Sequence, residues 1–215
     1  LREDQPNPLE LFQIWLNLPR ASKMVPPAFT MFWDESIPRH EQVDAEGRKI
    51  NLTLIAGSYA DKTPPRPPVD SWAGQVDSDV AIWTIKLEPG AQWVLPAAAE
   101  GTRRSLYFFE GRGLRAGGRE VPAYHRITLR DHAEVALEGG PDVNEILLLQ
   151  GRPIGEPIAR RGPFVMNTEG EIRQAYADYR ATGFGGWPWD GDDPVHGEKA
   201  ERFAQFTDGS RDQPA

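Results

Sequence analysis

The chain has 215 residues and a mass of 24.0 kDa, enough for one well-buried core with extra elements but too little for two complete ordinary domains. Its 39% hydrophobic and 26% charged residues are typical of a globular protein and exclude a disordered chain. The absence of cysteine excludes disulfides, thiolate metal sites and a cysteine nucleophile, and it is compatible with the cytoplasmic location that we expect.

The net charge of −8 is concentrated near the C-terminal end. Residues 187–215 hold seven acidic and three basic residues, which is half of the net charge. Because such a surface repels phosphate backbones, direct nucleic-acid binding is not expected, and the pairs Arg103-Arg104 and Arg160-Arg161 are too short to reverse this. No apolar run approaches the roughly 20 residues that span a bilayer, so no membrane segment is predicted.

The first 19 residues contain a nearly continuous apolar stretch at positions 9–18, which ends at Pro19. This pattern predicts a strand that is buried on both faces. Such a strand needs neighbours on both sides, yet nothing precedes it here. We therefore expect its partners to belong to another part of the protein.

Residues 20–79 are expected to form a linker and covering segment with one strand, at positions 50–56. Phe29, Phe32 and Trp33 predict a linker held down by buried aromatic side chains, with the acidic pair Asp34-Glu35 following them. The proline-rich stretch at 63–68 predicts a stiff arm that lies along the domain, although a polyproline ligand for an SH3-type partner is an alternative.

Residues 80–160 predict an antiparallel barrel or jelly roll, because short alternating strands recur there at regular intervals. The expected strands cover residues 80–87, 91–95, 105–109, 113–116, 119–121, 126–129, 133–137 and 145–149. Ala81, Trp83, Ile85 and Leu87 share one face of the first of these strands, and Gly117-Gly118 forms a hairpin turn.

Residues 161–215 are expected to form a C-terminal helix followed by an extended tail. Thr168 and Glu171 predict a capping box, and Gly183 predicts the helix end. Residues 185–190, which include Trp187 and Trp189, predict an arm that packs its indoles on the barrel or on another domain, with a partner-binding hot spot as the alternative. Phe203 and Phe206 predict a short helical turn, and residues 208–215 should fray.

Several stretches of this chain resemble the C-terminal part of pirins. They are Leu-Glu-Pro-Gly-Ala at 87–91, Leu-Tyr-Phe-Phe-Glu-Gly at 106–111, residues 145–158, Gly-Pro-Phe-Val-Met-Asn-Thr at 162–168, and Leu-Phe-Gln-Ile-Trp-Leu-Asn-Leu-Pro at 11–19. Pirins are bicupins, which have two barrels of the cupin superfamily in tandem. The resemblance implies that residues 1–19 hold the final strand of an incomplete N-terminal cupin barrel, that residues 80–160 form the C-terminal cupin barrel, and that residues 161–215 form the helix and tail.

The resemblance also implies where the family's iron is bound. Pirins hold one iron in the first barrel with His-x-His and His-x-Glu pairs, and neither pair occurs around His40, His125, His132 or His196. The generic cupin pattern would place ligands of a second site at positions 96, 98 and 127, where this chain has proline, alanine and isoleucine. A site built from His125 and His132 is the remaining alternative, and surface or hydrogen-bonded histidines are the simpler interpretation.

Carboxylates near strand ends, Glu88, Glu110 and Glu145, are available for acid–base chemistry, but so they would be in any acidic protein. We therefore predict no catalytic, cofactor-binding or metal-ligating residue in this chain, with iron expected in the N-terminal domain. The resemblance implies quercetin 2,3-dioxygenase activity of the intact bicupin on a flavonol, with that N-terminal cupin domain as partner. The alternative is a non-catalytic interaction or transcription co-regulator module.

Overall fold

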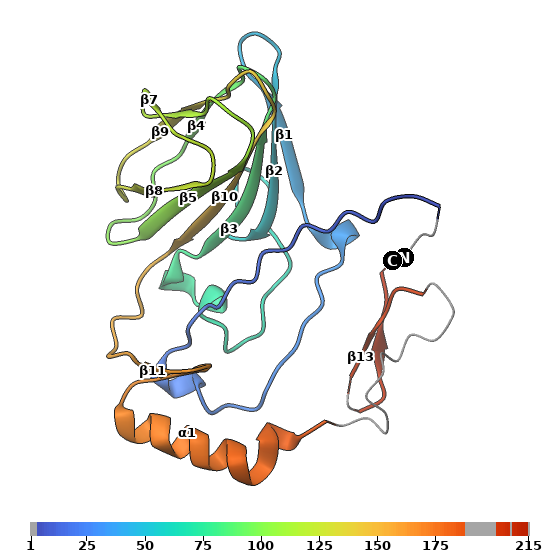
Figure 1. Cartoon of the computed structure of the whole chain (residues 1–215), viewed down its shortest axis with the longest axis vertical. Helices are drawn as coiled ribbons and strands as arrows, with labels where there is room; N and C mark the ends of the chain where they lie inside the picture. Colours follow the sequence, from blue (N-terminus) through green and yellow to red (C-terminus); the bar gives the residue numbers. More distant parts are fainter. Residues whose placement is uncertain (1–3, 188–200, 207, 215) are drawn as a thin grey trace.

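The computed structural model describes residues 4–187, 201–206 and 208–214 of the chain. Within these residues, a six-stranded sheet in the order β1-β2-β3-β10-β5-β8 packs against a four-stranded sheet in the order β4-β9-β6-β7, and all neighbouring strands are antiparallel (Figure 1). The strands are β1 Arg39–Val43, β2 Lys49–Ala56, β3 Ala81–Leu87, β4 Gln92–Leu95, β5 Arg103–Glu110, β6 Arg115–Ala116, β7 Arg119–Glu120, β8 His125–Leu129, β9 Val135–Glu138 and β10 Asn144–Gly151. The predicted antiparallel barrel is confirmed.

The barrel interior is an apolar core to which both sheets contribute. Burial alternates along β3, so that Trp83 and Ile85 point inward as the sequence pattern predicts. Trp93 and Leu95 of β4 enter the same core from the opposite sheet. Each side chain of this size contributes about 1.5–3 kcal/mol when it is fully buried. The interior is therefore filled by the residues that hold the barrel together.

The barrel begins well before residue 80, which corrects the prediction for residues 20–79. Two strands occur there instead of one, and β2 pairs directly with β3 from Ile50↔Leu87 onward. The missed strand, β1, pairs with β2 from Arg39↔Thr53 to Val43↔Lys49. Its side chains are only exposed or half-buried, so it lacks the apolar alternation by which strands are recognised. Pairing with β2 makes it a strand.

The helix α1, Glu169–Thr182, begins and ends where the sequence predicts. Its N-cap Thr168 accepts a hydrogen bond at Oγ1 from the N–H of Glu171 at 3.2 Å. Gly183 ends the helix in the left-handed conformation, with φ of 58°. Ile172 and Ala175 are buried on the face that packs toward the preceding segment. The cap is thus confirmed, and it fixes the position of the helix start.

A small hairpin, which the sequence analysis missed, lies between the barrel and α1. It consists of β11 Ala159–Arg161 and β12 Phe164–Met166. The ring of Phe164 stands edge-on to Tyr176 of α1, with 4.7 Å between the ring centroids. The chain therefore passes from the large sheet to the helix through this hairpin, which holds α1 away from the barrel (Figure 1).

The apolar stretch at residues 9–18 forms no strand in the described part of the chain, contrary to the prediction. It runs as an extended segment past the barrel (Figure 1), and Phe12 meets Phe109 of β5 edge-on with centroids 4.9 Å apart. A strand requires hydrogen bonds to a neighbour's backbone, and no described residue supplies them. Leu9, Leu11 and Trp15 are 85%, 75% and 66% exposed. The assignment of this segment to another barrel stays a prediction.

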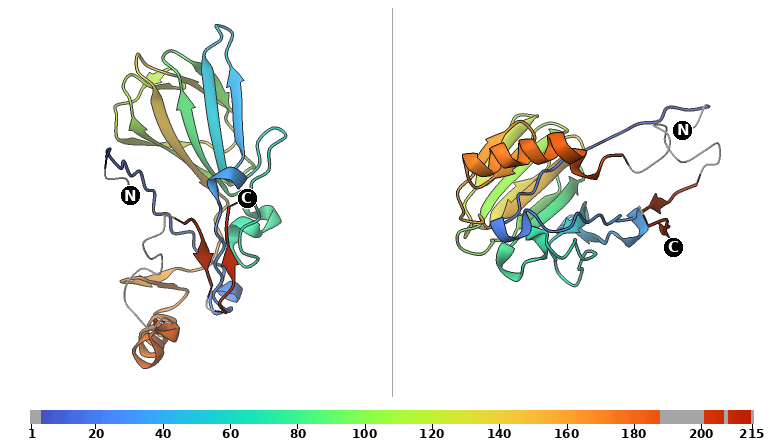
Figure 2. Two further views of the ribbon diagram at one scale, coloured as in Figure 1. Left: turned by 90° about the vertical axis from the view of Figure 1, so that its right-hand side faces the viewer. Right: turned by 90° about the horizontal axis from the view of Figure 1, so that it is seen from below.

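The C-terminal residues form a second small hairpin, β13 Ala204–Gln205 with β14 Arg211–Asp212, so the predicted helical turn and frayed end are wrong. The hairpin lies beside residues 29–36 (Figure 2). Phe29 packs against Phe206 with centroids 5.5 Å apart, and Trp33 Nε1 donates to Asp212 Oδ2 at 3.1 Å. The aromatic side chains of this linker thus contact the C-terminal hairpin, although none of Phe29, Phe32 and Trp33 is buried as predicted and Phe29 is 56% exposed.

Two further expectations concern the surface. Residues 64, 65, 67 and 68 of the proline-rich stretch are half-buried, as expected for an arm that lies along the domain. Trp187 is 61% exposed, whereas Trp189 lies outside the described residues. No α-helix in residues 4–187, 201–206 and 208–214 is both long and apolar enough to cross a bilayer.

Candidate functional site

The barrel interior offers no set of metal-binding donors. The side chains that fill it are apolar and buried, with Trp83, Leu106 and Phe108 among them. Of the positions at which the resemblance would place ligands, Ile127 packs half-buried against the core. No group of three or more histidine or acidic side chains close enough to hold a metal ion occurs in the described ranges. The residues present here therefore do not fit an iron site.

The histidines lie apart on the surface or in ordinary hydrogen bonds. His125 begins β8 and His132 follows its end, so the strand separates them, and both are exposed. His125 Nδ1 lies 2.9 Å from the carbonyl oxygen of Ala123, and His132 Nδ1 lies 2.7 Å from Asp131 Oδ1. His40 packs against Tyr59, and His196 lies outside the described residues. The structure does not bring His125 and His132 together.

Two of the three carboxylates named as acid–base candidates have structural partners. Glu88 Oε2 accepts a hydrogen bond from the N–H of Lys49 at 2.7 Å. Glu145 Oε1 pairs with Lys86 Nζ at 2.8 Å on the neighbouring strand. Glu110 is exposed at the end of β5. The contacts of Glu88 and Glu145 support the sheet and define no reaction centre.

A buried arginine closes one end of the barrel. Arg104 on β5 is 2% exposed, and its guanidinium donates to Gln150 Oε1 and to the carbonyl oxygens of Pro96, Arg130, Asp131 and Ala133 at 2.5–3.3 Å. Burial lowers the pKa of Arg104, while the nearby carboxylates of Asp79 and Asp131 raise it. With five acceptors around it, this group ties together the loops at that end. It is a structural group and leaves no free donor set for a ligand.

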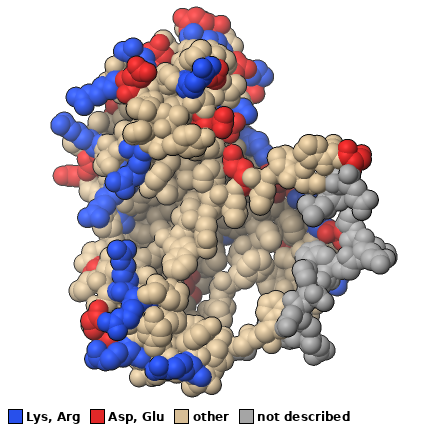
Figure 3. Space-filling model, in the orientation of Figure 1, with Lys and Arg blue, Asp and Glu red and all other residues tan. Residues whose placement is uncertain are grey.

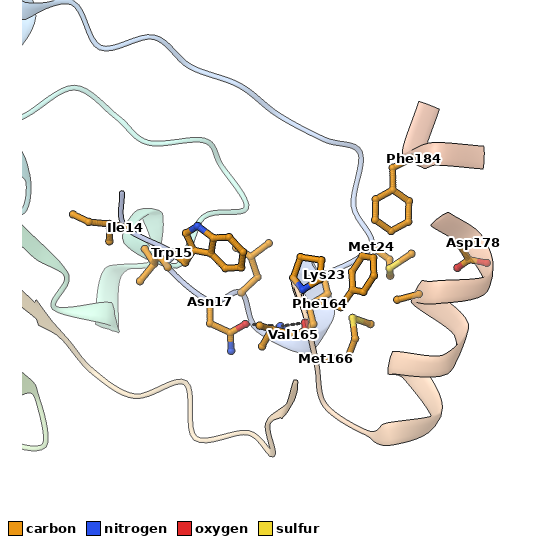
Figure 4. A pocket seen from close by; sticks show the side chains of 14 residues that line it. Ile14, Trp15, Asn17, Lys23, Met24, Phe164, Val165, Met166, Asp178 and Phe184 are labelled. Carbon is orange, nitrogen blue, oxygen red and sulfur yellow. Dashed lines mark hydrogen bonds between the residues drawn. The ribbon is translucent and has the colours of Figure 1, made fainter. Parts of the chain in front are cut away.

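A cleft remains between residues 14–24 and the unit formed by β12 and α1, and we call it the Lys23 cleft (Figure 4). It consists of two adjoining cavities of about 490 and 250 Å³. Both cavities are lined by Lys23, Met24, Met166, Ala175 and Asp178. The surface of both cavities is mainly apolar, and the smaller one adds Arg20, Asn167 and Glu171 to the lining residues that the two share.

Lys23 lines both cavities, and Figure 4 shows it among the side chains of the larger one. Its Nζ donates to Asn17 Oδ1 at 2.5 Å and to the carbonyl oxygen of Val165 at 3.2 Å. Burial lowers the pKa of Lys23, and the charges of Glu156 and Glu171 partly oppose this. The lysine thereby connects the segment before the barrel to β12.

Beside the smaller cavity, hydrogen bonds and an ion pair connect the first turn after Pro19, the loop before β11 and the start of α1. The N–H of Arg20 donates to Glu156 Oε2 at 2.7 Å, and its Nη2 pairs with Glu171 Oε1 at 2.8 Å. Asn167 Nδ2 donates to Glu156 Oε2 at 2.9 Å and to the carbonyl oxygen of Pro157 at 3.0 Å. Burial raises the pKa of Glu171, but hydrogen bonds from Thr168 and Asn167 and the charge of Arg20 hold it below its usual range.

Three aromatic side chains, Trp15, Phe164 and Phe184, are among those that line the larger cavity (Figure 4). Phe164 lies 5.7 Å from Phe184 between ring centroids, in an edge-on arrangement. The space-filling view shows that the surface between the barrel and α1 carries few charged side chains, whereas charges gather over the far end of the barrel and near α1 (Figure 3). The cleft therefore opens on an apolar face of the molecule.

A barrel of two packed antiparallel sheets, joined by short strands around an apolar core, defines a cupin-type β-barrel protein. A family model described as the Pirin C-terminal cupin domain matches residues 82–185. The chain belongs to the pirin family and carries its C-terminal cupin domain.

Known proteins resemble the chain over most of its length. A pirin-like protein of Caulobacter vibrioides is 32% identical over 169 residues, which cover 79% of this chain and 56% of that protein. Pirin of Homo sapiens is 28% identical over 180 residues, covering 80% and 56%. The crystal structure of a quercetin 2,3-dioxygenase from Acinetobacter baumannii superimposes with a TM-score of 0.66 at 31% identity, covering 80% of this chain and 55% of that one. The chain thus spans about half the length of the curated relatives it matches.

Sequence reasoning did not single out Lys23 or Asn167 of the cleft, or the buried Arg104. Asn167 was recognised only as part of the family-like motif at 162–168, and Arg104 only as half of a short basic pair. Asn167 precedes the capping threonine, which signals a helix start but does not reveal burial. Burial of Arg104 follows from alternation in β5, where exposed Arg103 and buried Arg104 occupy opposite faces.

Proposed function

We propose that this chain is the metal-free C-terminal part of a two-barrel pirin protein, and that the intact protein is a non-haem iron enzyme with quercetin 2,3-dioxygenase-type activity on a flavonol. The observation that carries the proposal is the apolar filling of this barrel: side chains such as Trp83 and Phe108 fill its interior, and the described residues there offer no group of metal-binding donors. Chemistry that needs iron would then take place in a second barrel, and this chain would support that barrel. We place the protein in the cytoplasm.

Residues 9–18 are the proposed contact with the N-terminal cupin barrel. They combine an extended backbone that pairs with no described strand and apolar side chains that remain largely exposed, Leu11 and Trp15 among them. Pairing in another sheet would satisfy the backbone groups and bury these side chains together. The same segment already contacts the sheet through Phe12, and its Asn17 accepts a hydrogen bond from Lys23 in the cleft, so it is held at two points.

The exposed apolar residues of 9–18 also favour the second candidate function, a non-catalytic interaction or co-regulator module, because contiguous exposed apolar side chains mark protein-binding surfaces. The two functions differ in what the intact protein does with iron and a flavonol. The net charge of −8 disfavours direct nucleic-acid binding in either case.

The test compares this chain with the intact two-barrel protein. We expect stoichiometric iron and oxygen-dependent loss of quercetin absorbance only in the intact protein. One iron or zinc per molecule in this chain alone would overturn the metal-free assignment. Intact protein with stoichiometric iron that leaves quercetin unchanged would refute the enzyme proposal in favour of the interaction module.

A paired variant tests the contact surface. Trp15→Ser should weaken the association of the two barrels in the intact protein and increase protease cleavage between them, because an apolar contact is lost. Val69→Ser, at a position that is 82% exposed outside this segment, is the matched control and should change neither. Equal effects of the two substitutions would contradict the proposed contact.

A further inference from the structure

Another cavity, of about 630 Å³, is bounded by residues 14–17 and by the outer face of the large sheet, and we call it the sheet pocket. Its floor is a row of three residues, Ile82 of β3, Leu149 of β10 and Ser105 of β5, which lie opposite one another in the strand register. Their neighbours along each strand fill the barrel core or are buried beside it. Because side chains alternate between the two faces of a strand, the row itself faces outward.

The sheet pocket has a surplus of positive charge. The charged residues that line it are Arg103, Arg152 and Glu156. Neither arginine forms an ion pair with a described residue, and their one side-chain hydrogen bond is the long contact of 3.5 Å from Arg152 Nη2 to the carbonyl oxygen of Glu100. Glu156 Oε2, in contrast, already accepts two hydrogen bonds. Two guanidinium groups in the lining are therefore available to an anion.

The two arginines lie at one end of an otherwise largely apolar pocket. Arg103 is two positions before Ser105 on β5, so it lies on the same face of the sheet and about 7 Å along the strand. It is paired with Gly151, the residue before Arg152. The hydrophobic side chains of the pocket are Ile14, Trp15, Leu16, Trp72, Val80, Ile82, Tyr107, Leu149, Pro153, Ile154 and Ile158. The lining thus combines a cationic end with an extended apolar surface.

The neutral polar groups of the lining divide into two kinds. Asn17 and Gln150 are held in hydrogen bonds within the molecule. The hydroxyl groups of Ser105 and Tyr107 make no hydrogen bond to a described residue. A hydroxyl can donate to an anion, so these two groups add to the donors that the arginines supply.

We propose that the sheet pocket binds an apolar monocarboxylate, a ligand with one carboxylate group on an apolar body. The carboxylate pairs with the guanidinium groups of Arg103 and Arg152, because the planar fork of an arginine matches the two oxygens of a carboxylate. The apolar body covers Ile82 and Leu149, which removes apolar surface from water. This site needs no metal and does not rest on the proposed dioxygenase function.

Other ligand classes use only part of this lining. An apolar ammonium would cover the floor but would be repelled by the two arginines. Inorganic phosphate would pair with the arginines but would leave the apolar floor exposed to water. A neutral apolar molecule would gain nothing from the two charges. The volume lies within the roughly 300–1,000 Å³ that is usual for small-molecule sites, so the pocket has room for both parts of the proposed ligand.

NMR of the tryptophan indole groups provides the test, because Trp72 lines the sheet pocket and does not line the Lys23 cleft. Titration of the 215-residue chain with 4-phenylbutyrate should shift the indole N–H signal of Trp72 saturably. The signal of Trp33, which is bonded to Asp212 of the C-terminal hairpin, should not move. The amide 4-phenylbutyramide has the same apolar body without the charge and should bind about tenfold more weakly. Equal binding of acid and amide, or no saturable shift of Trp72, would overturn the proposal.

Arginine variants test the charged end of the pocket. Arg103→Met should weaken 4-phenylbutyrate binding about tenfold and change amide binding little. The matched control is Arg119→Met, on β7 of the other sheet, which should leave both affinities unchanged. In the double variant Arg103→Met/Arg152→Met the acid should bind no better than the amide, and an acid that still binds more tightly would refute the role of the arginines. If the double variant does not fold, the comparison of acid and amide on the unaltered chain decides the proposal.

Discussion

Replacing Arg104 with methionine should destabilise the barrel strongly, because it removes the buried guanidinium that holds its closed end together. The side chain is 2% exposed, and it donates to five acceptors on three segments of the chain. Hydrogen bonds from a charged group contribute about 1.5–3 kcal/mol each, but they share one donor group and water can replace some of them. Each buried carbonyl oxygen that is left without a donor costs about 1–3 kcal/mol, so we expect a total loss of about 3–5 kcal/mol.

Urea unfolding followed by tryptophan fluorescence measures this loss. With a slope of about 2 kcal/mol per molar urea, the unfolding midpoint should fall by about 2 M. Arg103→Met is the matched control, since it removes the same charge from the exposed neighbouring position on β5 and should shift the midpoint by less than about 0.5 M. A loss below about 1 kcal/mol for Arg104→Met would show that water can replace these hydrogen bonds with little loss of stability.

Three further predictions follow from local contacts. Thr168→Ala should cost about 1 kcal/mol of unfolding free energy through loss of the helix cap, and a denaturant midpoint equal to that of the unaltered chain would contradict the cap. The N–H of Gly101 and contacts with His132 lower the pKa of Asp131 to about 2 from 3.8, so its stabilisation is complete above about pH 4 and is lost as the pH falls through 2. Asp131→Asn should flatten the acid side of the stability profile, and an unaltered profile would refute this. Trp33→Leu should speed proteolysis within residues 201–214, because the bond to Asp212 is lost, and the cleavage rate of the unaltered chain is the reference.

Local sequence signals were sufficient wherever a structure depends on neighbours in the chain. Thr168 and Glu171 predict the helix start correctly, because the two residues that form the cap are only three positions apart in the sequence. Strands such as β3 and β5 were predicted because buried and more exposed positions alternate along them against a shared core. The filled interior also followed from those inward positions, which hold residues such as Trp83 and Ile85.

Contacts between distant residues decided the rest. β1 is a strand only because β2 pairs with it, and the β13–β14 hairpin has Phe29 and Trp33 as partners, more than 160 residues away along the chain. The apolar pattern of residues 9–18 predicts a strand, yet no described strand pairs with it, because pairing is a property of two segments.

The sequence alone determined the class of barrel, the capped helix and the absence of a patterned set of histidine ligands, since alternation, capping and ligand spacing are all local. Only the tertiary structure showed which acceptors surround the guanidinium of Arg104, and that Lys23 and Asn167 line one cavity although 144 positions separate them in the sequence. The physical reason is that burial and the lack of a hydrogen-bond partner depend on what surrounds a side chain in space. No spacing along the chain encodes that.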